Sequence, residues 1–306
     1  MEKLAAMPVP DMVHNWLLNY FHNRSHFTRF NNTLSQSIAI NASFAQGGGL
    51  GPICYSLNSI DLHPKTEHND FIKYADDIYL VVPSQNSATI TSEIDALKIW
   101  AKLNNLNLNH SKTQEMVIFK QGTKIVDRIM PEEIDGIARV PIVKILGVYI
   151  DDKLTFNDHV SRISSAAASS LYALKLLRSK GLKEPSLWDI TSQTLVTRLL
   201  YAFQAWSGFL TKAALQQLNA IIHRAKKQSL LPRSYLGFDE LCQKADQTLF
   251  RVALNNQNHV LYHLFPPTRD FHYNLRPRAH DRKLPKIINN RDKQLFTNRM
   301  LYRDIY

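Results

Sequence analysis

The sequence predicts an α+β fold in which strands and helices alternate up to about residue 152, followed by an all-helical module and a basic C-terminal region. Apolar residues alternate with a period of two around residues 38–44, and residues 71–82 are rich in aromatic and β-branched side chains; both features are typical of strands. From about 153 to 229 they recur every three or four residues, which is typical of helices. Beyond residue 265 basic residues accumulate. The 306 residues suffice for more than one domain, and we expect boundaries at 1–152, 153–235 and 236–306.

The composition is that of a globular protein and excludes a mostly disordered chain, since 44% of the residues are hydrophobic and 21% are charged. The two cysteines, Cys54 and Cys242, exclude a disulfide scaffold and favour a reducing compartment. The N-terminus resembles no signal peptide, and the apolar stretches are too short to span a membrane. We therefore expect an intracellular protein, nuclear or cytoplasmic or both, with no membrane partner.

Positive charge is the first indication of function. Lys and Arg number 37 against 26 Asp and Glu, a net charge of +11. Such an excess attracts polyanions, of which nucleic acid is the commonest. The excess is strongest in residues 269–306, where Tyr273, Arg276 and Arg278 interleave aromatic and basic side chains in a way that suits single-stranded nucleic acid. A solvated basic tail or a packed C-terminal arm is the alternative.

A helix and a strand lead into a glycine-rich loop. Helical spacing of apolar residues predicts the helix over 11–22, and alternation predicts the strand over 38–44. The loop that follows would let backbone amides approach a ligand closely, although a plain flexible loop is the alternative. Its sequence is Gln46-Gly47-Gly48-Gly49-Leu50-Gly51-Pro52.

A hairpin with two adjacent acids comes next. Strands are predicted over 71–75 and 78–82, because both segments are rich in aromatic and β-branched residues. Asp76 and Asp77 form the turn between them. A helix over 88–104 follows from its amphipathic pattern, and a polar turn then carries Lys112.

The remaining elements complete the first module and build the second. Gly181 lies where the long helix that begins near 160 should end. The predicted elements are strands over 116–119, 140–143 and 145–150, with Gly147 between the last two, and helices over about 160–174, 187–203 and 213–229. The sequence beyond 267 looks irregular, and the helical tryptophans Trp188 and Trp206 are expected to lie in the core.

Two neighbouring carboxylates at a hairpin tip repel each other and need a compensating cation. Asp76 and Asp77 therefore suggest a divalent-metal site, in which Mg²⁺ would suit the oxygen ligands and assist a phosphoryl displacement. A plain polar turn is the alternative, since aspartate is common in turns.

The order of these segments resembles the reverse transcriptase of non-LTR (LINE-type) retrotransposons. Five segments carry the resemblance: the loop at 46–52, the Tyr74-Ala75-Asp76-Asp77 box, the turn at 108–113, the Ile145-Leu146-Gly147-Val148 strand and the segment 200–206. The resemblance implies a partial right-hand polymerase palm, an antiparallel sheet with helices, followed by a helical thumb and a basic C-terminal region.

The resemblance also implies roles and partners. Asp76 and Asp77 would be catalytic carboxylates and metal ligands for two Mg²⁺ ions, and Lys112 would neutralise or protonate the pyrophosphate. Gln46, Gly47 and Gly51 would position the nucleotide and template. Leu146, Gly147 and Val148 would guide the primer end. An RNA template, a DNA primer and deoxynucleotide triphosphates would be the partners.

One departure from the family pattern bears on activity. Such polymerases take another aspartate from an earlier palm strand, and the residues before the helix at 11–22 offer no counterpart. We expect the chain to be the C-terminal part of a longer protein, with an incomplete two-ion site, no activity alone, and a missing endonuclease and fingers portion as partner. A catalytically inactive nucleic-acid-binding remnant is therefore an alternative. A palm-fold nucleotide cyclase is another, which the helical thumb and basic tail disfavour.

Overall fold

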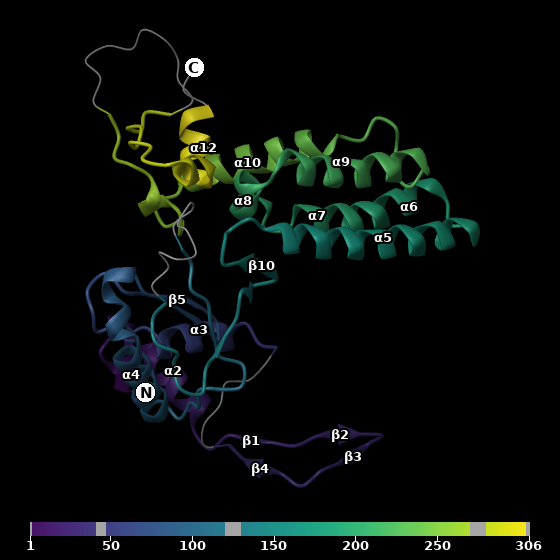
Figure 1. Ribbon diagram of the computed structural model, residues 1–306. Helices are drawn as coiled ribbons and strands as arrows, with labels where there is room; N and C mark the ends of the chain where they lie inside the picture. Colours follow the sequence, from purple (N-terminus) through teal and green to yellow (C-terminus); the bar gives the residue numbers. More distant parts are fainter. Residues whose placement is uncertain (1, 41–46, 120–129, 270–279, 304–306) are drawn as a thin grey trace. The chain divides into compact units, whose positions relative to one another are not determined.

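The computed structural model describes residues 2–40, 47–119, 130–269 and 280–303 (Figure 1). The chain divides into two compact units. Unit 1 comprises residues 1–115 and 129–138, and unit 2 comprises 116–128 and 139–306. Gln46 and the three predicted tail residues, Tyr273, Arg276 and Arg278, lie outside the described residues.

Unit 1 combines helices with short antiparallel strand pairs. Its helices are α1 (Glu2–Ala5), α2 (Asp11–Phe21), α3 (Leu50–Asn58) and α4 (Ile90–Leu103), the last preceded by a 3-10 helix, η1 (Ser84–Thr89). Its strands are β1 (Ser25–His26), β2 (Arg29–Phe30), β3 (Thr33–Leu34), β4 (Ile38–Ala39), β5 (Asp70–Tyr74), β6 (Asp77–Val81) and β7 (Gln114–Glu115). The predicted helices at 11–22 and 88–104 and the predicted hairpin are confirmed.

Residues 25–39 form an exposed ribbon that the sequence analysis missed. β1 pairs with β4, and β2 pairs with β3, both antiparallel. Asn31 and Asn32 form the two-residue turn with φ of 44° and 62°, a conformation that asparagine tolerates better than most residues. The predicted strand over 38–44 is therefore shorter than expected in the described residues, since β4 ends at Ala39.

Unit 2 contains one strand pair and most of the helices. β8 (Ala138–Arg139) lies at the boundary between the units, and β9 (Ile142–Ile145) pairs with β10 (Val148–Asp151). The helices are α5 (Asn157–Ser179), α6 (Glu184–Thr191), a π-helix η3 (Ser192–Val196), α7 (Thr197–Leu200), α8 (Phe203–Trp206), η4 (Ser207–Phe209), α9 (Lys212–Lys227), α10 (Phe238–Asn255), η5 (Tyr262–Leu264), α11 (Asn290–Gln294) and α12 (Phe296–Arg303). None of the helices in the described part of the chain is both long and apolar enough to cross a membrane.

The principal core belongs to unit 2, between α5, the α6–α8 segment and α9. Trp206 is fully buried there, as the sequence predicts, and packs edge-on against Phe203. α5 and α9 run in the same direction (Figure 1). Phe156, just before α5, contacts Phe209, which precedes α9. At the other end Arg178, in the last turn of α5, donates to the carbonyl of Gln228, just after α9. The bundle therefore has two distinct ends.

Three predictions are corrected, and the palm arrangement stays a prediction. The helix predicted over 187–203 is interrupted, because Ala202 takes a left-handed φ of 49° and redirects the chain between α7 and α8. The strand predicted over 116–119 is wrong, since the short β7 ends at Glu115. The C-terminal region is not irregular throughout, since it contains α11 and α12. The expected palm sheet is represented, among the described residues, only by two-stranded pairs.

The C-terminal helices pack tightly on the rest of unit 2. A Cβ on Gly208, in η4, would lie 1.9 Å from the Gln294 carbonyl oxygen of α11. In α10, Asp246 is 3% exposed and accepts from Arg299 of α12 at 3.1 Å. The same guanidinium donates to Ser207 Oγ at 2.9 Å. These contacts join α8, η4, α10, α11 and α12.

Candidate active site

The β5–β6 hairpin presents the two candidate carboxylates to solvent. Tyr74 pairs with Asp77, so the turn consists of Ala75 and Asp76. Ala75 has a left-handed φ of 49°, which strains a residue other than glycine and often marks a functional site. Asp76 and Asp77 are both exposed. The predicted hairpin is therefore confirmed, but its turn is shifted by one residue: Asp76 lies in the turn, whereas Asp77 is the first residue of β6.

One face of the hairpin packs on α4. Phe71 of β5 is buried against Leu62 and Leu97, and Ile78 and Leu80 of β6 pack on the same cluster. Alternation along the strands leaves Asp77 on the other face, where its Oδ2 accepts from Tyr79 Oη at 3.4 Å. Burial of the apolar face thus determines which way the acid at 77 points.

The turn that carries Lys112 begins at the same apolar cluster, through Leu108. Asn109 closes the turn, since its side-chain oxygen accepts from the Lys112 backbone N–H at 3.2 Å and its carbonyl accepts from the Thr113 N–H at 3.0 Å. The Lys112 side chain is exposed. The structure places it in solvent on an ordered turn of unit 1.

The glycine loop leads directly into α3, and the charge of Asp76 affects the pKa of a tyrosine in α3. Gly47 has φ of 83°, and a Cβ on Gly47, Gly48 or Gly49 would meet nothing within 4 Å, so this backbone is open on both sides. Gly51 is half-buried in the first turn of α3. Burial raises the pKa of Tyr55 in α3, and the negative charge of Asp76 raises it further. The hairpin tip therefore lies near the helix that follows the loop.

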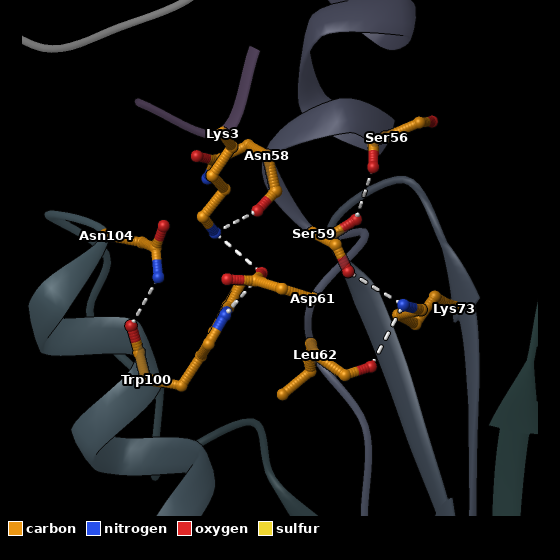
Figure 2. Close-up of polar contacts among 9 residues, drawn as sticks. All are labelled: Lys3, Ser56, Asn58, Ser59, Asp61, Leu62, Lys73, Trp100 and Asn104. Atoms are coloured by element: carbon orange, nitrogen blue, oxygen red, sulfur yellow. Dashed lines mark hydrogen bonds and ion pairs between the residues drawn. The ribbon is translucent and has the colours of Figure 1, made fainter. Parts of the chain in front are cut away.

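Two lysines fix the end of α3 against the hairpin (Figure 2). Lys73 of β5 donates to the carbonyls of Ser59 at 2.7 Å and Leu62 at 3.1 Å. Lys3 of α1 donates to the Asn58 carbonyl at 2.5 Å and pairs with Asp61 at 2.6 Å. Cations at a helix C-terminus satisfy its last carbonyls and complement its dipole.

The same cluster perturbs its own titrating groups. Burial lowers the pKa of Lys73, whereas the Asp61 carboxylate raises it and Lys3 lowers it, with a net decrease. Burial would raise the pKa of Asp61, but hydrogen bonds from Lys3 and Trp100 lower it overall. Trp100 Nε1 of α4 donates to Asp61 at 3.0 Å, as Figure 2 shows. α1, α3, α4 and β5 thus meet at one polar junction.

Lys73→Met is expected to destabilise unit 1 by about 1.5–3 kcal/mol, the usual value of hydrogen bonds to a charged group. The methionine keeps most of the aliphatic stem but leaves the Ser59 and Leu62 carbonyls without their donor. Urea unfolding measures the loss, and hydrogen exchange should show faster opening of β5 and β6. Lys98→Met is the matched control, because Lys98 is exposed on α4 and forms an ion pair with its neighbour Asp95 on the same helix. Equal effects of the two variants would contradict this role.

A buried carboxylate fixes the segment between α3 and β5. Glu93 of α4 has no exposed surface and accepts from the backbone N–H groups of Lys65 and Thr66 and from Asn69 Nδ2 at 2.8–3.0 Å. Burial acts to raise the pKa of Glu93, but these hydrogen bonds lower it overall. Sequence analysis missed Glu93, Lys73 and Lys3, because no pattern shows which charged residues accept or donate to distant backbone groups.

The hairpin tip offers two carboxylates as possible metal ligands. Carboxylate oxygens are suitable donors for Mg²⁺. However, the described ranges contain no group of three His, Cys, Asp or Glu side chains placed to hold a metal ion. Asp76 and Asp77 therefore supply suitable but insufficient donors for a two-ion site.

In unit 2, the predicted primer-guiding segment forms the turn of the β9–β10 hairpin. Ile145 pairs with Val148, which leaves Leu146 and Gly147 as the turn residues, with φ of 45° and 90°. Tyr201 supports this turn: its hydroxyl donates to the Leu146 carbonyl at 2.8 Å, and a Cβ on Gly147 would lie 3.2 Å from its ring. The break between α7 and α8 brings Tyr201 to this place.

Two polar residues connect this hairpin to the bundle. Asp151 of β10 accepts from the backbone N–H groups of Lys153, Thr155 and Phe156. Burial acts to raise the pKa of Asp151, but these hydrogen bonds lower it overall. His159 of α5 is buried, and burial lowers its pKa, so the imidazole that accepts from the Tyr149 N–H at 3.4 Å is neutral at pH 7.

Tyr201→Phe is expected to loosen the β9–β10 turn at a cost of about 0.5–1.5 kcal/mol, because it removes one hydrogen bond and keeps the ring. Faster hydrogen exchange at the turn amides is the direct measurement, with urea unfolding for the energy. Tyr172→Phe on α5 is the control, since Tyr172 is 73% exposed. Unchanged exchange in Tyr201→Phe would show that the hydroxyl does not support the turn.

The comparisons with known proteins agree with one another. The family described as reverse transcriptase (RNA-dependent DNA polymerase) matches residues 1–150. Among curated Drosophila melanogaster proteins, the chain is 27% identical over 223 residues to the probable RNA-directed DNA polymerase from transposon X-element, covering 69% of this chain and 24% of the relative. It is 25% identical over 226 residues to the probable RNA-directed DNA polymerase from transposon BS, covering 69% and 25%.

A third relative is the RNA-directed DNA polymerase from mobile element jockey, 26% identical over 201 residues, which are 60% of this chain and 21% of that protein. The chain thus spans about a quarter of the length of the curated relatives it matches. No solved structure matches it significantly. On the family match and these three relatives, the chain belongs to the reverse transcriptase family of non-LTR retrotransposons.

Proposed function

We propose that this chain is part of an RNA-directed DNA polymerase that extends a DNA primer on an RNA template. In this proposal residues 1–152 are a partial palm, 153–235 a thumb and 236–306 a basic C-terminal region. An RNA template, a DNA primer and deoxynucleotide triphosphates are the partners. The family match over residues 1–150 and the names of the relatives support the proposal.

The observation that carries the proposal is the exposed carboxylate pair on a strained turn beside α3. Asp76 and Asp77 repel each other in the free protein, and both are exposed, so the pair is accessible to a cation that would offset the repulsion. The charge of Asp76 reaches α3, whose first turn continues the open glycine loop. A triphosphate bound along that loop would lie near the two acids.

The reaction is attack of the primer 3′-hydroxyl on the α-phosphate of the nucleotide, with release of pyrophosphate. Mg²⁺, when bound, would supply charge stabilisation at the attacking and leaving oxygens. Asp76 and Asp77 would provide oxygen ligands. Gly47 and Gly51, with Gln46, would position the nucleotide and template through the backbone, and Lys112 would neutralise or protonate the pyrophosphate. Leu146, Gly147 and Val148 would guide the primer end.

Primer extension tests the proposal directly. The full chain, together with the endonuclease and fingers portion expected as its partner, is incubated with an RNA template annealed to a DNA primer, deoxynucleotide triphosphates and Mg²⁺. We expect incorporation that follows the template sequence and stops when the metal is chelated. Incorporation that ignores the template, or tight binding of primer–template with no incorporation, would contradict the proposal.

A second candidate is a nucleic-acid-binding remnant without polymerase activity. One observation favours it: no third metal-ligating side chain lies with Asp76 and Asp77 among the residues that the structure describes. Two carboxylates alone would lose much of the transition-state stabilisation of a two-ion site. Binding of primer–template that is unchanged by Mg²⁺ and by Asp76→Asn, without extension, would identify the remnant.

A further inference from the structure

One end of the helical bundle in unit 2 carries a dense group of cations, which we name the basic end. Its members are Arg178, Lys180 and Lys183, at and beyond the end of α5, and Arg224, Lys226 and Lys227 in the last turn of α9. All but the half-buried Lys226 are exposed. None of the six makes an ion pair in the described part of the chain.

The two helices bring these cations together because α5 and α9 are parallel. Arg178 donates to the Gln228 carbonyl, and Trp188 Nε1 of α6 donates to the Ser229 carbonyl at 3.4 Å, so the ends of both helices and the start of α6 are in contact. Beside them is a hollow of about 580 Å³ between α9 and the start of α10, lined in part by Arg224, Lys226 and Lys227. The cations therefore form one surface.

Complementing helix dipoles does not account for this amount of charge. One or two cations in the last turn suffice for each dipole, at typically 0.3–1 kcal/mol apiece. No acidic residue occurs between Lys212 and Phe238, and the two acids that follow are engaged in hydrogen bonds, Asp239 with Asn219 at 2.9 Å and Glu240 with the Gly237 N–H. In α6, Glu184 and Asp189 offset only part of the six charges. The surplus is open to an external anion.

The basic end lies far from the β9–β10 turn within the same unit. α5 starts just after β10, and its 23 residues rise about 34 Å at 1.5 Å per residue. Tyr201 and Phe209 lie at the hairpin end, and the six cations lie at the other. Because phosphates of one strand repeat every 3.4 Å or so along a duplex, the two ends would meet backbone positions about ten base pairs apart.

We infer that the basic end is a second nucleic-acid-binding surface, which holds the phosphate backbone about ten base pairs away from the β9–β10 turn. The choice of nucleic acid as the polyanion rests on the proposed function. Exposed Lys and Arg side chains without acidic partners bind phosphates regardless of sequence, and each contact releases counterions. The surface therefore contributes affinity and salt dependence, not sequence selectivity.

Direct binding of a DNA duplex of about 20 base pairs, two helical turns, tests the inference across a salt series. The cluster variant combines Lys180→Gln, Arg224→Gln and Lys227→Gln. The control variant combines Lys212→Gln, Lys244→Gln and Arg251→Gln, which removes the same charge from exposed positions elsewhere in unit 2. Thermal unfolding of each variant shows whether it remains folded.

The cluster variant is expected to bind at least about tenfold more weakly, with a slope of log K against log salt shallower by about 2–3, whereas the control stays close to the unsubstituted chain. Equal losses in both variants, or no loss in the cluster variant, would overturn the inference. Stronger dependence of anionic vesicle binding than of duplex binding on the cluster would assign the surface to lipid and also overturn it. This experiment measures binding and not synthesis. A chain that binds the duplex normally but does not extend a primer would therefore contradict only the proposed function.

Discussion

Asp76→Asn and Asp77→Asn should each lower template-directed incorporation by about 10²–10³-fold, the loss typical for removal of one group that stabilises charge in the transition state. Asparagine keeps the size of the side chain but removes the charge that would hold a divalent cation. Folding should not suffer, because Asp76 and Asp77 are exposed and their mutual repulsion is relieved. Single-turnover extension measures the rate, and thermal unfolding is expected to be unchanged or slightly improved.

Asp70→Asn is the matched control, because Asp70 is an exposed acid at the opposite end of β5. It should leave extension unchanged. A second measurement checks the placement of Asp76 independently of activity: in Asp76→Asn the pKa of Tyr55 should fall, since one of the two causes that raise it is removed. If Asp70→Asn reduced extension as much as Asp76→Asn did, a general charge effect would replace the metal-ligand role.

Arg299→Ala should destabilise unit 2 by about 3–5 kcal/mol, the usual cost of breaking a buried ion pair from one side. Asp246 is 3% exposed in the unsubstituted chain, and among the described residues it would keep only Arg303, at 3.9 Å, as a charged partner. Ser207 Oγ and the Gln204 carbonyl would lose their guanidinium donor as well. Urea unfolding measures the loss. Arg251→Ala, an exposed arginine of α10, should change little.

The loss should depend on pH in a defined direction. Burial raises the pKa of Asp246, and Arg299 and Arg303 lower it in part, with a net increase. Without Arg299 the pKa must rise further. An aspartate whose pKa is higher in the folded than in the unfolded state costs the least stability when it is protonated in both states. This holds below the ordinary aspartate pKa of about 3.9. The unsubstituted chain shares this cost up to its own raised pKa of Asp246, so the destabilisation of Arg299→Ala should grow as pH rises above that raised pKa. A loss independent of pH would contradict the ion-pair role.

Local patterns predicted the elements that depend on nearby residues. The aromatic and β-branched residues on either side of Asp76 and Asp77 predicted β5 and β6, and the spacing of Val160, Ala167 and Leu174 predicted α5. The prediction of one helix over 187–203 is wrong because the helix is interrupted at Ala202. Tyr201 stabilises the break by donating to the Leu146 carbonyl, which is a contact between distant segments. The 25–39 ribbon did have a local signal, the Asn31-Asn32 pair, whose tendency toward left-handed conformations predicts a tight turn.

The candidate site shows the same limit. Sequence motifs located Asp76, Asp77, Lys112 and the glycine loop. They did not indicate that Lys73 would fix the hairpin to the end of α3. A lysine within a strand has no pattern that distinguishes an exposed position from one that donates to distant carbonyls. Such contacts depend on how elements pack, which the order of residues in one strand does not encode.

A substitution at Gly208 would separate α11 and α12 from the bundle without changing any residue of the candidate active site or of the basic end. Position 208 has no room for a side chain, since the nearest obstacle to a Cβ is the main-chain carbonyl of Gln294, followed by Arg299 Nε at 2.8 Å. The methyl group of Gly208→Ala would force α11 and α12 to move away, whereas the core around Trp206 would keep its packing. A variant in which α11 and α12 are displaced would show what these helices contribute to the stability of unit 2, because every charged residue is still present in the chain.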